Sequence, residues 1–197
     1  MEMLVVVLIV GVLASMGVTQ YYKAVEEAKA DHASSMTSMI GAAVRMYMVD
    51  HPNQAIVPGQ LTSACNSECC YDGPGLDCPA PGTTTAAQAD PCQIVACGYL
   101  PYQDFSCLPY SYSISNGGAP PTGAPQPGFA YAARQTNSSG CADPNVTTNL
   151  ATTDQPFATW AYEYVQQGCL CPFNGAPMSG KFNSSVPSCA AVGAGCD

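Results

Sequence analysis

The sequence predicts an α+β fold, in which a long N-terminal α-helix packs on a small antiparallel β-sheet within a loop-rich, disulfide-stapled head. Apolar residues recur at helical spacing up to residue 50, three later segments alternate large and small side chains, and all twelve cysteines follow residue 64. We therefore divide the chain into a helix over 1–50 and a Cys-rich globular head over 51–197. The helix is apolar over 1–22 and amphipathic over 23–50.

Composition narrows the class of protein. The 197 residues include 18 Gly and 17 Pro, are 10% charged and carry a net charge of −9. Their apolar fraction of 47% excludes a disordered acidic tail, and the sequence has no collagen repeat. The five Lys and Arg residues form no cluster. We therefore expect no direct binding of nucleic acid, which requires clustered basic groups to displace phosphate counterions.

The helix begins with sixteen uncharged, mostly apolar residues at 3–18. At about 1.5 Å per residue they form roughly 24 Å of helix, which approaches the ~30 Å hydrocarbon core of a membrane if residues 19–22 extend it. Glu2 precedes the run, whereas a secretory signal carries positive charge at this place. We therefore expect the run to belong to the working protein and to need a partner for its apolar surface.

The second half of the helix has one apolar side. Its expected core positions, at steps of three and four, are Val25, Ala28, His32, Met36, Met39, Ile40, Ala43, Val44 and Tyr47. The expected wetter side carries Lys23, Glu26, Glu27, Lys29 and Asp31. The pattern ends at Asp50, because Pro52 disfavours helical conformation in the preceding residue. The resulting helix is about 75 Å long, so its first half must project from a domain of this size.

Glu2 lies at the edge of the apolar run. An ionised carboxylate there is costly in a bilayer unless it is paired, and the nearest base in the sequence, Lys23, is roughly six helical turns away. We therefore expect the partner on another chain. The N-terminal amine of a neighbouring copy fits, since head-to-tail pairing generates an open filament. The alternative is a solvent-exposed glutamate at a frayed terminus.

Residues 2–22, EMLVVVLIVGVLASMGVTQYY, resemble the N-terminal segment of bacterial type IV pilins and pseudopilins. Glu2 matches the early glutamate of that family and Gly11 matches its glycine, and the resemblance extends to about residue 30. Two features depart from the family pattern. Only Met1 precedes the glutamate, so we expect further residues before it, and Thr19 replaces the family's helix-kinking proline. Whether the helix continues between Gly11 and Thr19 is therefore open.

The resemblance implies the major structural subunit of an extracellular type IV pilus-like filament, a homopolymer without enzymatic activity or cofactor. It also implies an inner-membrane location before assembly, and contact with prepilin peptidase and the pilus assembly machinery. The residues expected to assemble the filament are Glu2, Met3, Leu4, Val5, Leu8, Gly11, Leu13, Gly17 and Thr19. Two alternatives are a pseudopilin of a type II secretion system and a membrane-anchored adhesive or binding module.

Three segments of the head alternate large and small residues: 110–115, 129–134 and 159–165. This period of two is typical of strands with one buried face. We expect them to form an antiparallel meander packed on the second half of the helix. The Gly-, Pro- and Thr-rich stretches at 80–85 and 116–128 hold too few large apolar groups for a core and are predicted to be surface loops.

The head contains an even number of cysteines. They are Cys65, Cys69, Cys70, Cys78, Cys92, Cys97, Cys107, Cys141, Cys169, Cys171, Cys189 and Cys196. Their number and confinement favour disulfides formed outside a reducing cytosol, and the alternative, a zinc site, lacks the usual CxxC spacing. The pairing stays open, except that we expect the adjacent Cys69 and Cys70 to have different partners. By resemblance, Cys189 and Cys196 are candidates to close a C-terminal loop.

Other chemical signals are weak. The sequons at Asn137, Asn145 and Asn183 are candidate glycosylation sites, with ordinary loop chemistry as the alternative. The only histidines, His32 and His51, lie on the helix and at its end, remote in sequence from the Ser and Cys residues of the head. A catalytic nucleophile needs a base within hydrogen-bond reach, so we expect no enzyme. The aspartates of the head lack EF-hand spacing, and we expect no metal.

Overall fold

A computed structural model describes residues 2–52, 54–66, 69–70, 88–114, 128–135, 156–165, 168–177 and 189. Its helices are α1 (Glu2–Asp50) and α2 (Gln93–Ala96), with 3-10 turns η1 (Ser63–Asn66), η2 (Phe105–Cys107) and η4 (Pro156–Thr159). Its strands are β1 (Ala55–Ile56), β2 (Gly59–Gln60), β3 (Gln88–Ala89), β4 (Tyr110–Ile114), β5 (Gly128–Arg134), β6 (Ala161–Val165) and β7 (Leu170–Phe173). The chain is thus α+β, as the sequence predicts.

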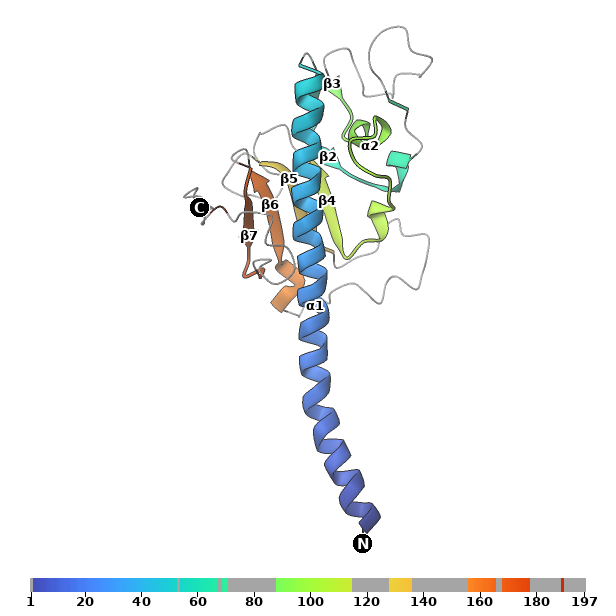
Figure 1. Ribbon diagram of the computed structural model, residues 1–197, viewed down its shortest axis with the longest axis vertical. Coiled ribbons are helices and arrows are strands. Elements are labelled where there is room, and N and C mark those ends of the chain that lie inside the picture. Colours follow the sequence, from blue (N-terminus) through green and yellow to red (C-terminus); the bar gives the residue numbers. More distant parts are fainter. Residues whose placement is uncertain are drawn as a thin grey trace.

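The main sheet has five antiparallel strands in the order β2-β4-β5-β6-β7, and β1 pairs with β3 in a separate parallel ladder. The predicted meander is present as β4, β5 and β6. The sequence analysis missed β2 and β7, which have only two and four residues and no clear alternation. Figure 1 shows the C-terminal part of α1 lying across this sheet and the N-terminal part extending away from the head.

The face of the sheet that packs on α1 is shaped by residue size. Two rows of side chains cross it in register: Tyr112, Ala132, Tyr162 and Ile114, Ala130, Tyr164. The small alanines of the central strand β5 lie between large residues on both sides, which leaves a trough for the helix. Gly41 lies at the closest approach, since a Cβ atom there would be 2.0 Å from Cδ1 of Tyr164.

Helix α1 runs without interruption through Gly11 and Thr19, so the long helix is present as expected. Its buried side differs from the predicted one. Met36, Ile40, Ala43, Val44 and Tyr47 are buried as expected, together with Ala30, Ala33, Ser34 and Thr37. In contrast, Ala28, His32 and Met39 are exposed and Val25 is half-buried. The expectation was wrong at these positions because the helix carries apolar residues on two sides, and spacing alone does not tell which side faces the sheet.

All nine cysteines in the described part of the chain form disulfides. Cys65 bonds Cys92 and Cys70 bonds Cys97, so two bridges hold the short helix α2 at its two ends. Cys69 and Cys70 therefore have different partners, as predicted. A third bridge joins Cys169 to Cys189 and closes a loop of 20 residues. The suggested pairing of Cys189 with Cys196 is wrong, because Cys189 lies beside the start of β7, where its amide donates a hydrogen bond to Leu170. Cys78, Cys141 and Cys196 lie outside the described residues.

Candidate assembly surface

The N-terminal part of α1, up to residue 22, forms a rod outside the head (Figure 1). Every side chain described between residues 3 and 24 is exposed, from Met3 at 84% to Val12 at 49% among the large apolar ones. The predicted assembly residues Met3, Leu4, Val5, Leu8, Gly11, Leu13 and Gly17 lie on this rod. Glu2 and Thr19 belong to the same helix, but their side chains fall outside the described residues.

Within the described chain, no side chain of the rod is buried by the head. A Cβ atom added at Gly11 or at Gly17 would meet nothing within 4 Å. Hydrogen bonds of the helix itself hold the segment, and Ser15 adds one from its hydroxyl to the carbonyl of Val12 at 2.9 Å. The helix continues through both glycines even though each costs about 1 kcal/mol relative to alanine.

The apolar surface of the rod is large, and the described part of the chain does not cover it. Eleven large apolar side chains between residues 3 and 18 are exposed. At about 1.5 kcal/mol or more for each buried side chain, covering them is worth on the order of 15 kcal/mol. By length and composition, α1 is able to cross a membrane, and none of its most apolar 18-residue window is buried in the structure.

An ion cluster holds α1 where the rod leaves the head. Arg134 of β5 donates to both carboxylate oxygens of Glu26, from Nε at 3.1 Å and from Nη2 at 3.2 Å. Lys29 Nζ lies 2.5 Å from the same carboxylate, and the Arg134 guanidinium lies 5.5 Å from the centre of the Tyr110 ring. The expectation that Glu26 faces water was wrong, since it is only 6% exposed. Local sequence patterns do not predict this pair, because 108 residues separate its two members in the sequence.

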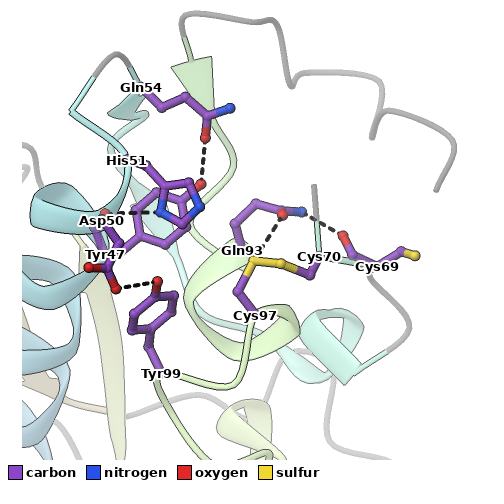
Figure 2. The surroundings of a disulfide bond; sticks show 9 residues. All are labelled: Tyr47, Asp50, His51, Gln54, Cys69, Cys70, Gln93, Cys97 and Tyr99. Atoms are coloured by element: carbon purple, nitrogen blue, oxygen red, sulfur yellow. Dashed lines mark hydrogen bonds between the residues drawn. A yellow bond between two sulfur atoms is a disulfide. The ribbon is translucent and has the colours of Figure 1, made fainter. Parts of the chain in front are cut away.

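The opposite end of α1 is fixed by aromatic residues, as Figure 2 shows. The His51 ring stacks on Tyr47 with centroids 4.2 Å apart, and the Tyr47 hydroxyl donates to Gln54 at 2.7 Å. Tyr99 donates from its hydroxyl to the carboxylate of Asp50, also at 2.7 Å. His51 therefore serves the packing of the helix end, next to the Cys70–Cys97 bridge, whereas His32 lies exposed on α1.

One buried carboxylate lies on the other face of the sheet. Glu163 of β6 has no exposed surface, and its Oε1 accepts a hydrogen bond from the hydroxyl of Tyr131 on β5 at 2.8 Å. Its Oε2 has no hydrogen-bond partner among the residues that the structure describes. Burial raises the pKa of Glu163 to about 7, although the Tyr131 hydrogen bond acts in the opposite direction. Strand alternation places Glu163 on this face. A glutamate on the outer face of a sheet is expected to be exposed to solvent, so the sequence analysis did not predict that Glu163 is buried.

The structure does not describe the three predicted glycosylation sites. Asn137, Asn145 and Asn183 lie outside the described residues. Within the part of the chain that the structure describes, no group of three or more His, Cys, Asp or Glu residues is arranged to hold a metal ion. No protein-family model, curated protein or solved structure matches the chain at a significant level. The physical features of the rod and the head are therefore the basis for a functional conclusion.

Proposed function

We propose that this protein is the major structural subunit of an extracellular type IV pilus-like filament. The observation that carries the proposal is a continuous helix whose first half is apolar, exposed and projecting from a disulfide-bonded head. Exposure of such an apolar surface to water is unfavourable, so the rod needs a lipid or protein environment. In the proposed cycle the rod anchors the subunit in the inner membrane before assembly and lies in the filament core afterwards.

The mechanism of cohesion follows from the chemistry of the rod. Burial of the apolar side chains of residues 3–18 against neighbouring rods supplies most of the stabilisation. Glu2 selects the axial register of neighbouring subunits, because its carboxylate is favourable in an apolar core only where it meets a hydrogen-bond donor or a cation. The N-terminal amine of another copy is the proposed cation, and a head-to-tail contact of this kind repeats without closing.

The head is suited to exposure outside the cell. Nine described cysteines are all oxidised, a state typical of extracellular and periplasmic proteins. Each bridge that closes a loop of 20 to 27 residues adds about 3 kcal/mol of stability by restricting the unfolded chain. Resemblance of the rod to type IV pilins adds prepilin peptidase and the pilus assembly machinery as partners.

The assembly role is tested by changing Glu2. We expect Glu2→Ala and Glu2→Gln to leave the head folded and disulfide-bonded but to reduce filament number at least tenfold, as counted by electron microscopy of sheared surface material. The matched control is Glu27→Gln, which removes an exposed carboxylate that pairs only loosely with Lys23 at 3.9 Å. Normal filaments from the Glu2 variants would contradict the pairing role.

The same micrographs distinguish the other functions that this helix permits. Long fibres of uniform subunits are expected for a major pilin. Short pieces would instead indicate a pseudopilin of a type II secretion system, and the absence of any fibre would indicate a membrane-anchored adhesive or binding module.

A further inference from the structure

Two methionines lie exposed on the head half of α1. Met39 is 39% exposed and Met46 is 59% exposed. In contrast, Met36 is 7% exposed, and its sulfur lies 3.7 Å from Nε2 of Gln103. Met48 is half-buried and packs against the core of the head. Methionines that are close together in the sequence therefore differ in their access to solvent.

Met39 and Met46 lie on one side of the helix, the side that faces away from the sheet. They are seven residues apart, which corresponds to nearly two helical turns and about 10 Å along the axis. Ala42 and Val49 continue the same exposed side at steps of three and four. The two thioethers therefore belong to a side of the helix whose exposed members at this spacing are apolar.

Methionine is the oxidisable form of sulfur in the described part of the chain. All nine described cysteines are in disulfides, so none of them carries a free thiol. Disulfide-bonded proteins belong to oxidising compartments such as the periplasm and the cell surface. There, an exposed thioether is open to oxidation to a sulfoxide, whereas a buried one such as that of Met36 is shielded.

We propose that Met39 and Met46 form a reversible oxidation site for peroxides, and that their oxidation blocks assembly of the subunit. Each thioether sulfur attacks one oxygen of hydrogen peroxide, so that an S–O bond forms while the O–O bond breaks. The sulfur loses two electrons, and the other oxygen leaves as water after the proton of the transferred oxygen moves to it. A methionine sulfoxide reductase, with a dithiol as reductant, returns the thioether and releases water.

The effect on assembly rests on the filament function proposed above. With the rods inside the filament and the heads outside, the side of α1 that faces away from its own sheet faces the interior. A sulfoxide is polar and accepts hydrogen bonds, so burial of this side without a donor becomes unfavourable. The head itself stays folded, because neither methionine belongs to its described core. Oxidation therefore acts on assembly and not on folding.

Peptide mapping tests the oxidation site without reference to filaments. The full chain in detergent is treated with hydrogen peroxide, and the sulfoxide at each methionine is followed over time by tandem mass spectrometry. We expect Met39 and Met46 to be oxidised at least tenfold faster than Met36, which is the internal control because it lies buried on the same helix. Equal rates at the three positions would overturn the site.

Leucine substitutions test the control of assembly. Cells are sheared free of filaments and allowed to regrow them with or without hydrogen peroxide. In the unsubstituted chain we expect peroxide to reduce filament number at least tenfold. The double variant Met39→Leu and Met46→Leu keeps two apolar side chains of similar volume without sulfur, so it is expected to regrow filaments equally under both conditions. Met36→Leu is the matched control and is expected to stay sensitive to peroxide.

The outcomes distinguish this inference from the filament function. Equal sensitivity of the double variant and the unsubstituted chain would overturn the role of the two methionines. Normal regrowth by the unsubstituted chain with both methionines oxidised would overturn it as well, and both results leave the filament function standing. Absence of filaments from the unsubstituted chain without peroxide would overturn the filament function and the control of assembly together, while peptide mapping would still decide the oxidation site.

Discussion

At the scale of single residues, two buried glutamates differ in how their charge is compensated. Glu26 is shared by Arg134 and Lys29, so its ionised form is paired on two sides. Among the described residues, Glu163 accepts a hydrogen bond from one neutral donor, Tyr131, and its second oxygen has no partner. The carboxylate of Glu163 is therefore disfavoured relative to the acid, which is why its pKa lies near 7 instead of 4.5.

The raised pKa of Glu163 makes stability depend on pH. Between about pH 4.5 and pH 7 the folded state binds a proton that the unfolded state releases, so the free energy of unfolding falls as pH rises through this window and stays lower above it. Glu163→Gln keeps an acceptor for Tyr131 and removes the charge. We expect it to stabilise the head by about 2 kcal/mol at pH 8 and to have little effect at pH 5, measured by denaturant unfolding in detergent. Equal effects at both pH values would contradict the role of ionisation.

At the scale of elements, α1 is one helix in two environments. The rod half has open space around its glycines, whereas the head half lies in a trough that Ala130 and Ala132 leave between larger residues. Gly41 is required there by the close approach of the Tyr164 ring and not by backbone conformation. The two types of glycine are indistinguishable in the sequence.

This difference predicts that the same substitution destabilises the head at one glycine and leaves its stability unchanged at the other. Gly41→Ala forces Tyr164 or the helix to move, and we expect it to destabilise the head by about 3 kcal/mol. Gly17→Ala meets nothing within 4 Å and raises helix propensity by about 1 kcal/mol, so the melting temperature of the head should not change. Differential scanning calorimetry in detergent compares them, and equal melting temperatures for the two variants would contradict the packing of α1 on β6.

At the scale of the whole molecule, association and folding depend on different parts of the chain. The described core residues begin at Ala30, and every cysteine follows residue 64. The described side chains of residues 3–22 are all exposed and add nothing to the described core of the head. The Glu26–Arg134 pair joins the two parts at the point where the rod begins, so the rod leaves the head in a defined direction.

Removal of residues 1–22 is therefore expected to give a folded monomer in water. The full chain, in contrast, should require detergent, lipid or assembly into a filament, because the described part of one copy leaves its apolar rod uncovered. Size-exclusion chromatography with light scattering measures both states. A full chain that stays monomeric in water without detergent would contradict the proposed function, and stable association of the truncated chain would assign the cohesion to the head.

Much of this architecture was predictable from local patterns. The helix and its end at Asp50, three strands of the meander and the oxidised state of the cysteines follow from periodicity, proline position and cysteine count. Short strands such as β2 and β7 were not predictable, because two to four residues show no period. The proposed assembly residues were derived from one apolar run and one resemblance.

The sequence alone determined the long helix, the three longer strands of the meander and the apolar surface of the rod, because these depend on residues close together in the chain. Only the tertiary structure decided which of the two apolar sides of α1 faces the sheet, that Glu26 pairs with Arg134, that Glu163 is buried, and that Cys189 bonds Cys169. Each of these depends on residues distant in sequence that meet only when the sheet closes on the helix. Burial and pairing are therefore properties of the folded chain as a whole.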